Sequence, residues 1–141
     1  MITTAISQPQ NLGKTNISYS PAIVGASNLV YSPNTVFRIA LLTKYVGEQY
    51  MGNIDADLSK LKAYLTNDIS ISYVWTPNSW IKEAQFSLLF NNILNELYSS
   101  NGFFYTFDDD YSVPNVVTTI EGVGYYPQAG ANFLLGVTFR F

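Results

Sequence analysis

The stretch from Phe103 to Tyr111 gathers the side chains that could most readily bind a ligand. Its aromatic residues alternate with polar ones and lead into three consecutive aspartates, Asp108 to Asp110. Aromatic rings can stack on a planar ligand, and carboxylates can supply oxygen ligands to a cation such as Ca²⁺. The alternative is a loop whose rings pack on neighbouring loops and whose carboxylates stay solvated. The candidate ligand-binding rings are Phe104, Tyr105, Phe107 and Tyr111.

The remaining residues offer little for catalysis. The chain has no histidine and no cysteine, which removes the usual general base, the commonest metal ligand and all thiol chemistry. The aspartates lack the D-x-D-x-D-G spacing of a calcium loop. The formal net charge of −3 argues against a phosphate-binding surface. We therefore expect no enzyme, no metal site, no cofactor and no nucleic-acid partner.

The composition is poor in charge and rich in aromatic residues. Charged residues make up 12% of the 141 residues and aromatic residues 16%. An average chain carries about 25% charged residues, so this chain has few with which to coat a soluble surface. No run approaches the roughly 18 apolar residues of a membrane helix. The composition therefore leaves few charges for a soluble surface, and it offers no membrane-spanning helix.

The last eleven residues form the clearest predicted strand. Successive side chains of a strand point to opposite faces, and here one face is wholly large and apolar. The eight residue-to-residue steps from Phe133 to Phe141 rise about 3.3 Å each. In a strand tilted by about 40° they cover roughly 20 Å of membrane depth, close to the apolar band of about 25 Å on outer-membrane barrels. The pattern therefore favours a lipid-facing strand. The residues of its apolar face are Phe133, Leu135, Val137, Phe139 and Phe141.

The same alternation predicts an all-β chain, an antiparallel meander of about five strands. We expect short turns near Pro33 and Pro77, where proline pre-sets the backbone. Residues 1–21 read as a polar lead-in, and 22–141 as the strands with their connections. The connections at about 51–63 and 99–130 are predicted to be long loops. The four earlier strands are predicted at 22–32, 35–50, about 61 or 64 to 75, and 83–98.

Aromatic residues gather at the predicted strand ends. Girdles of aromatic residues at the membrane interfaces are typical of transmembrane β-barrels. Five strands are too few to close such a barrel, so this chain could form only part of its wall. The alternative is a soluble β-sandwich that uses these rings as its core. Four charged residues, Arg38, Lys44, Asp68 and Arg140, fall on the opposite, lumen face. The expected girdles are Tyr31, Phe37, Trp75, Trp80 and Phe139 at one end, and Tyr45, Tyr64, Tyr98 and Phe133 at the other.

Three motifs carry a resemblance to a known family. The C-terminal YYPQAGANFLLGVTFRF, the stretch KYVGEQYMGN at 44–53 and the stretch FNNILNELY at 90–98 occur in that order. Together they resemble the C-terminal part of TonB-dependent outer-membrane receptors of the type found in Bacteroidota. The resemblance runs from about residue 16 to 141. The plug domain, the segment that contacts TonB and most of the barrel have no counterpart here.

The resemblance implies a location and a set of partners. Such receptors lie in the bacterial outer membrane, have about 22 strands around a plugged lumen, and import a scarce solute such as a ferric siderophore, cobalamin or another metal complex. The partners would be the rest of the barrel and plug, the outer-membrane lipid, and TonB through the missing plug. The barrel-assembly machinery would read the terminal apolar stripe that ends at Phe141. The rings near Phe104 would then face an aromatic siderophore.

Overall fold

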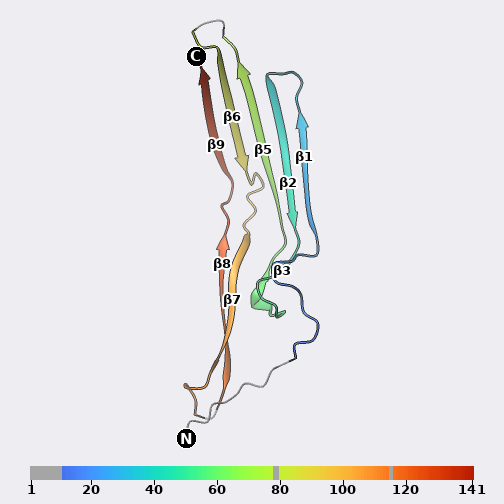
Figure 1. Ribbon diagram of the computed structural model, residues 1–141, viewed down its shortest axis with the longest axis vertical. Coiled ribbons are helices and arrows are strands. Elements are labelled where there is room, and N and C mark those ends of the chain that lie inside the picture. Colours follow the sequence, from blue (N-terminus) through green and yellow to red (C-terminus); the bar gives the residue numbers. More distant parts are fainter. Residues whose placement is uncertain (1–10, 78–79, 115) are drawn as a thin grey trace.

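The computed structural model describes residues 11–77, 80–114 and 116–141, and these form an all-β structure (Figure 1). Five strands make one antiparallel sheet in the order β1-β2-β5-β6-β9. Every strand pairs with the next in that order, so the predicted five-stranded meander is confirmed. The strands are β1 (Val24–Tyr31), β2 (Phe37–Val46), β5 (Tyr64–Trp75), β6 (Glu83–Asn91) and β9 (Asn132–Arg140).

Smaller elements lie beyond one end of this sheet. The connection between β2 and β5 contains β3 (Gln49–Tyr50), the 3-10 turn η1 (Asp57–Ser59) and β4 (Lys60–Leu61), with β3 paired to β4. The connection between β6 and β9 contains β7 (Ser99–Asp109) and β8 (Thr118–Pro127). These two strands form a separate antiparallel ribbon that extends away from the sheet (Figure 1).

The ribbon corrects the prediction of a loop over 99–130. The segment Phe103–Phe107 and the segment from Val116 to Ile120 are rich in aromatic and β-branched residues, which favour strands. Between the two strands, the Asp109 carboxylate accepts hydrogen bonds from the backbone N–H groups of Tyr111 and Ser112, a turn that aspartate commonly makes. The strand signal was therefore present in the sequence, but the length of the connection obscured it.

The fourth strand is also shorter than predicted. It ends at Asn91 and not at Tyr98, because Asn92 and Asn95 both adopt left-handed backbone conformations, with φ of 50° and 52°. Asparagine tolerates this region better than most residues. Tyr98 consequently follows a turn and precedes β7. Likewise, the strand predicted over 35–50 is interrupted after Val46, and only Gln49 and Tyr50 resume pairing.

The turn at Pro33 is as predicted. Residues 32–36 join β1 to β2, and the Asn34 carboxamide oxygen accepts hydrogen bonds from the N–H groups of Val36 and Phe37. The β5–β6 connection near Pro77 is also short, although residues 78–79 of it lie outside the described part of the chain. Residues 11–21 contain no strand, in agreement with the predicted lead-in, of which 1–10 fall outside the described residues.

The main sheet is a single open layer. Over residues 11–77, 80–114 and 116–141, no second sheet stacks on either of its faces, and the β3–β4 pair and the ribbon lie beyond its end (Figure 1). Few large side chains are buried; Leu61 and Tyr64, both near that end, are among them. None of the described helical residues forms a helix long and apolar enough to cross a membrane. The sheet is therefore held by strand pairing more than by a core.

Candidate functional site

The register of the main sheet gathers the large apolar side chains on one face. Residues directly opposite each other in antiparallel strands share a face. Ile39 pairs with Ile71, which continues through Leu88 to Leu135. These side chains therefore share one face. Parallel rows are formed by Phe37, Tyr73, Phe86 and Val137, and by Leu29, Leu41, Ile69, Phe90 and Phe133.

This apolar face is exposed. Leu135 is 68% exposed and Phe133 is 66% exposed, at the edge strand β9, and Leu29 at the opposite edge is 66% exposed. A soluble protein rarely leaves a contiguous apolar surface of this extent uncovered. We therefore expect the apolar face to be covered, either by an apolar phase such as lipid or by another protein surface.

One end of the sheet carries the first predicted group of aromatic residues. Tyr31 ends β1, Phe37 begins β2 and Trp75 ends β5. Beyond the strands, the Trp80 ring stacks on Phe141 with centroids 5.1 Å apart, and Phe139 lies 6.5 Å from Phe141. The Lys82 ammonium donates to the Phe141 carbonyl oxygen at 2.9 Å. The predicted aromatic residues are thus brought together at this end.

At the other end, the register separates the second predicted group. Tyr45 pairs with Leu65 and so belongs to the apolar face, whereas Tyr64 pairs with Val46 on the opposite face. Tyr64 is buried and stacks on Tyr98, with ring centroids 4.1 Å apart. Tyr64 therefore stacks on Tyr98 on the side of the sheet opposite the apolar face, and the two rings do not form part of a girdle. Tyr45 and Phe133 remain on the apolar face.

The opposite face of the sheet carries the small and polar residues. Arg38, Ser72, Ser87 and Gly136 form one row across four strands. Asp68 and Lys44 lie on this face as predicted, and the Asp68 carboxylate accepts the backbone N–H of Asn92 at 2.7 Å. The sheet therefore has one apolar and one polar face.

The β7–β8 ribbon carries a continuous row of aromatic rings, here called the aromatic ladder: Phe103, Tyr105, Phe107 and Tyr126. Centroids of successive β7 rings are 6.3 Å apart, with interplanar angles of 14° and 19°. The Tyr126 ring lies 6.2 Å from Phe103. Each ladder ring is 46–52% exposed. The structure thus joins the rings into one surface.

Two glycines explain how the rings lie. Phe103 is paired with Gly124, and Tyr105 with Gly122. A Cβ atom at either glycine would overlap the facing ring, so the Phe103 and Tyr105 rings lean over the backbone of β8. Glycine therefore provides the space in which an aromatic ring covers the neighbouring strand.

The ladder differs from the set of rings expected to bind a ligand. Tyr105 and Phe107 belong to it, but Phe104 alternates to the other face, where its ring would lie 3.2 Å from a Cβ atom added at Gly52. Tyr111 is 91% exposed in the turn. Phe103 and Tyr126 were missed. Their signal was the spacing of two residues from Phe103 to Phe107, matched by the spacing of Gly122 and Gly124.

Hydrogen bonds at the base of the ribbon fix it to the rest of the chain. The Tyr19 hydroxyl donates to the Gly102 carbonyl oxygen and the Tyr125 hydroxyl to that of Leu58, each at 2.7 Å. Tyr19 also donates its backbone N–H to Tyr50, while holding a φ of 54° that tyrosine rarely adopts.

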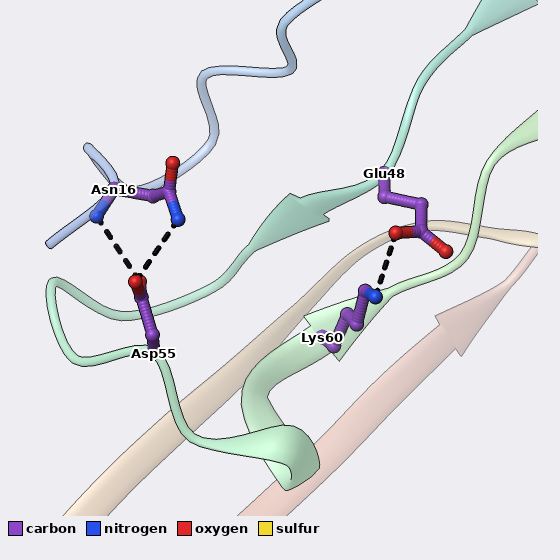
Figure 2. A network of polar contacts seen from close by, with 4 residues as sticks. All are labelled: Asn16, Glu48, Asp55 and Lys60. Atoms are coloured by element: carbon purple, nitrogen blue, oxygen red, sulfur yellow. Dashed lines mark hydrogen bonds and ion pairs between the residues drawn. The ribbon is translucent and has the colours of Figure 1, made fainter.

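Two polar contacts brace this junction (Figure 2). Asp55 accepts hydrogen bonds from the backbone N–H and the side-chain amide of Asn16, at 3.1 and 3.0 Å. Glu48 and Lys60 form an ion pair at 2.6 Å, and the hydrogen bond with Glu48 raises the pKa of the Lys60 ammonium. The lead-in, the β3–β4 loop and the ribbon therefore meet at one junction.

The aspartates at the tip of the ribbon make local contacts. The Asp108 carboxylate accepts a hydrogen bond from the Thr119 hydroxyl at 2.7 Å. Hydrogen bonds from the Ser112 side chain and from the backbone N–H groups of Tyr111 and Ser112 lower the pKa of Asp109. Among the described residues, no group of three or more acidic side chains is placed to hold a metal ion.

The two candidate functional surfaces of the described residues are thus an exposed apolar sheet face and an exposed aromatic ladder. The chain matches no protein-family model, no curated protein and no solved structure.

Proposed function

We propose that this chain is part of the wall of a bacterial outer-membrane β-barrel, and that the barrel is a TonB-dependent receptor. The five-stranded sheet would cross the membrane with its apolar face against lipid and its polar face toward the lumen. The β7–β8 ribbon would project from the outer mouth. The whole receptor would import a scarce solute such as a ferric siderophore, cobalamin or another metal complex.

The observation that carries the proposal is the uncovered apolar face. Its rows run across β2, β5, β6 and β9 without a charged side chain, while the opposite face carries Arg38, Lys44 and Asp68. A transmembrane barrel requires this arrangement, because lipid contacts one side and water or the plug the other. A β-sandwich would need a second sheet on the apolar face.

The open edges of the sheet agree with a larger assembly. Among the described strands, β1 and β9 each pair on one side only. An unpaired backbone group in lipid costs several kcal/mol, so in a membrane both edges need further strands. The proposal therefore requires additional barrel strands beside β1 and beside β9.

The connections support the proposed orientation. The turn at 32–36 and the β5–β6 turn are short, whereas the β2–β5 and β6–β9 connections are long and lie at the other end of the sheet. Barrels have short periplasmic turns and longer extracellular loops. The end with Trp75 and Phe139 would then be periplasmic, and the ribbon would lie outside the cell.

Lipid contact can be tested by fluorescence quenching of Trp75 in the purified protein reconstituted into vesicles of brominated lipid. Trp75 lies at the end of β5, where a girdle ring belongs at the level of the lipid headgroups. Lipids brominated near the headgroup should quench its emission more than lipids brominated at the chain ends. Trp80→Phe leaves Trp75 as the only tryptophan of this chain. A chain that stays monomeric in detergent-free buffer, with no quenching, would favour the soluble β-sandwich.

A further inference from the structure

We propose that the aromatic ladder is a docking surface for a separate, cationic peptide segment in extended conformation, with a basic side chain at every second position. The inference goes beyond the receptor role, because it depends on the ribbon alone. It would hold equally if the main sheet packed on protein instead of lipid.

The spacing of the ladder matches an extended peptide. Successive centroids along Phe103, Tyr105 and Phe107 are 6.3 Å apart, and Tyr126 continues the row at 6.2 Å. Side chains two residues apart on a strand are separated by about 6.6 Å. Alternate side chains of an extended segment of about seven residues would therefore meet all four rings in register.

The charge of the ribbon selects a cationic partner. Residues 99–127 contain four carboxylates, those of Asp108, Asp109, Asp110 and Glu121, and neither lysine nor arginine. Asp109 lies on the ladder face, two residues beyond Phe107, whereas Asp108 and Glu121 lie on the other face. Glu121 pairs with Thr106, which lies between Tyr105 and Phe107, and the three aspartates directly follow Phe107, so all four carboxylates belong to the part of the ribbon next to the ladder. Electrostatic attraction acts over about one Debye length, roughly 8–10 Å.

The ring chemistry agrees with that charge. Arginine and lysine side chains are attracted to the faces of aromatic rings. Each exposed pair of a cation and a ring strengthens binding by about two- to five-fold. Anionic chains such as nucleic acids also stack on rings, but they require basic residues along their backbone, which this ribbon lacks. A peptide with alternating arginines satisfies both the rings and the carboxylates.

The ladder is accessible in the described part of the chain. The contacts that fix the ribbon are made at its base, by Tyr19 with Gly102 and by Leu58 with Tyr125. Between these contacts and the tip, Tyr105 is 52% exposed and Phe107 is 49% exposed. Docking therefore requires no rearrangement of the junction.

The test is fluorescence anisotropy of a labelled peptide of alternating arginine and threonine, titrated with the full-length protein in detergent micelles. Tyr105→Leu and Phe107→Leu keep an apolar side chain on the strand but remove the ring. Each should weaken binding about three-fold, and the double variant about ten-fold. Tyr111→Leu is the matched control, since Tyr111 lies off the ladder, and it should leave the affinity unchanged.

Charge and register are tested separately. Glu121→Gln should weaken binding and flatten its dependence on salt, while a peptide with the same composition but its arginines in one block should bind less tightly. Equal binding of the two peptides, or unchanged affinity in the double leucine variant, would overturn the proposal. So would tight binding of a neutral oligosaccharide that displaces the peptide and is insensitive to Glu121→Gln, because the ladder would then be a sugar-binding platform.

Discussion

At the scale of single residues, Asn92 links the ribbon to the sheet. It is 5% exposed and takes a left-handed conformation at the end of β6. Its carboxamide donates to the carbonyl oxygens of Glu96 and Ala129 and accepts the N–H of Glu96. The Asn92 side chain thus bonds both the segment that precedes β7 and the segment that follows β8.

Replacing Asn92 should therefore destabilise the protein through two separable effects. Asn92→Ala removes the buried hydrogen bonds and strains the left-handed backbone, and we expect a loss of about 2–4 kcal/mol in the free energy of unfolding. Asn92→Gly removes the same bonds but relieves the strain, so its loss should be smaller by about 1 kcal/mol. Denaturant unfolding in micelles measures both. Equal losses would show that the backbone conformation contributes nothing.

Asp109 should make the tip of the ribbon sensitive to acid. Its pKa is lowered by hydrogen bonds from Ser112 and Tyr111 in the folded chain, so the carboxylate stabilises the turn fully above the unfolded-state pKa. The stabilisation is lost as the pH falls through the lower, folded-state pKa. Amide hydrogen exchange of residues 111 and 112 should accelerate, relative to β6 amides, below about pH 4. Asp109→Asn should remove this acid dependence; its persistence would assign it to another group.

At the scale of elements, the ribbon depends on the fit between rings and glycines. Gly122→Ala or Gly124→Ala would force the facing ring away from β8, since a Cβ has no room there. We expect a cost of about 1–3 kcal/mol to local stability, measured as faster hydrogen exchange along β7 and β8. Gly25→Ala is the control, because a Cβ at that position on β1 meets nothing within 4 Å. Equal effects at Gly25 and Gly122 would exclude the ring contact as the cause.

The sequence predicted the main sheet better than its ends. Alternation sufficed for the sheet because each strand has one apolar face, as from Ile69 to Trp75 and from Phe133 to Phe139. It failed at Asn92, where side-chain hydrogen bonds to distant residues end the strand, and no local pattern encodes such bonds. It also misplaced Tyr64, because the rings were grouped by strand end alone, whereas the odd spacing of five residues from Ile69 puts Tyr64 on the opposite face.

The rings of the aromatic ladder were only partly predictable, for a similar reason. Phe103 and Tyr105 alternate in the sequence, but Tyr126 joins them only through the pairing of β8 with β7, in which Tyr126 lies opposite Asn101. Phe104 was grouped with Tyr105 and Phe107 because the segment was predicted to be a loop. Once the segment is a strand, adjacent rings point to opposite faces.

At the scale of the whole molecule, the main sheet is a single layer whose two faces are both uncovered among the described residues. The five-stranded sheet has neither a second layer nor a substantial core among the described residues, and its edges are open. Such a sheet is not expected to be stable in water alone, since its exposed apolar face and its unpaired edges both favour association. A membrane barrel with additional strands would satisfy both requirements.

The most direct test of lipid contact is a pair of arginine substitutions at neighbouring positions of β9. Val137 lies on the apolar face opposite Phe86, and Thr138 lies on the polar face opposite Gln85. In the full-length protein in lipid, we expect Val137→Arg to lower the free energy of unfolding by about 2–4 kcal/mol, and Thr138→Arg to change it by less than about 0.5 kcal/mol. A loss below about half a kcal/mol for Val137→Arg, or equal losses at both positions, would contradict a lipid-facing sheet.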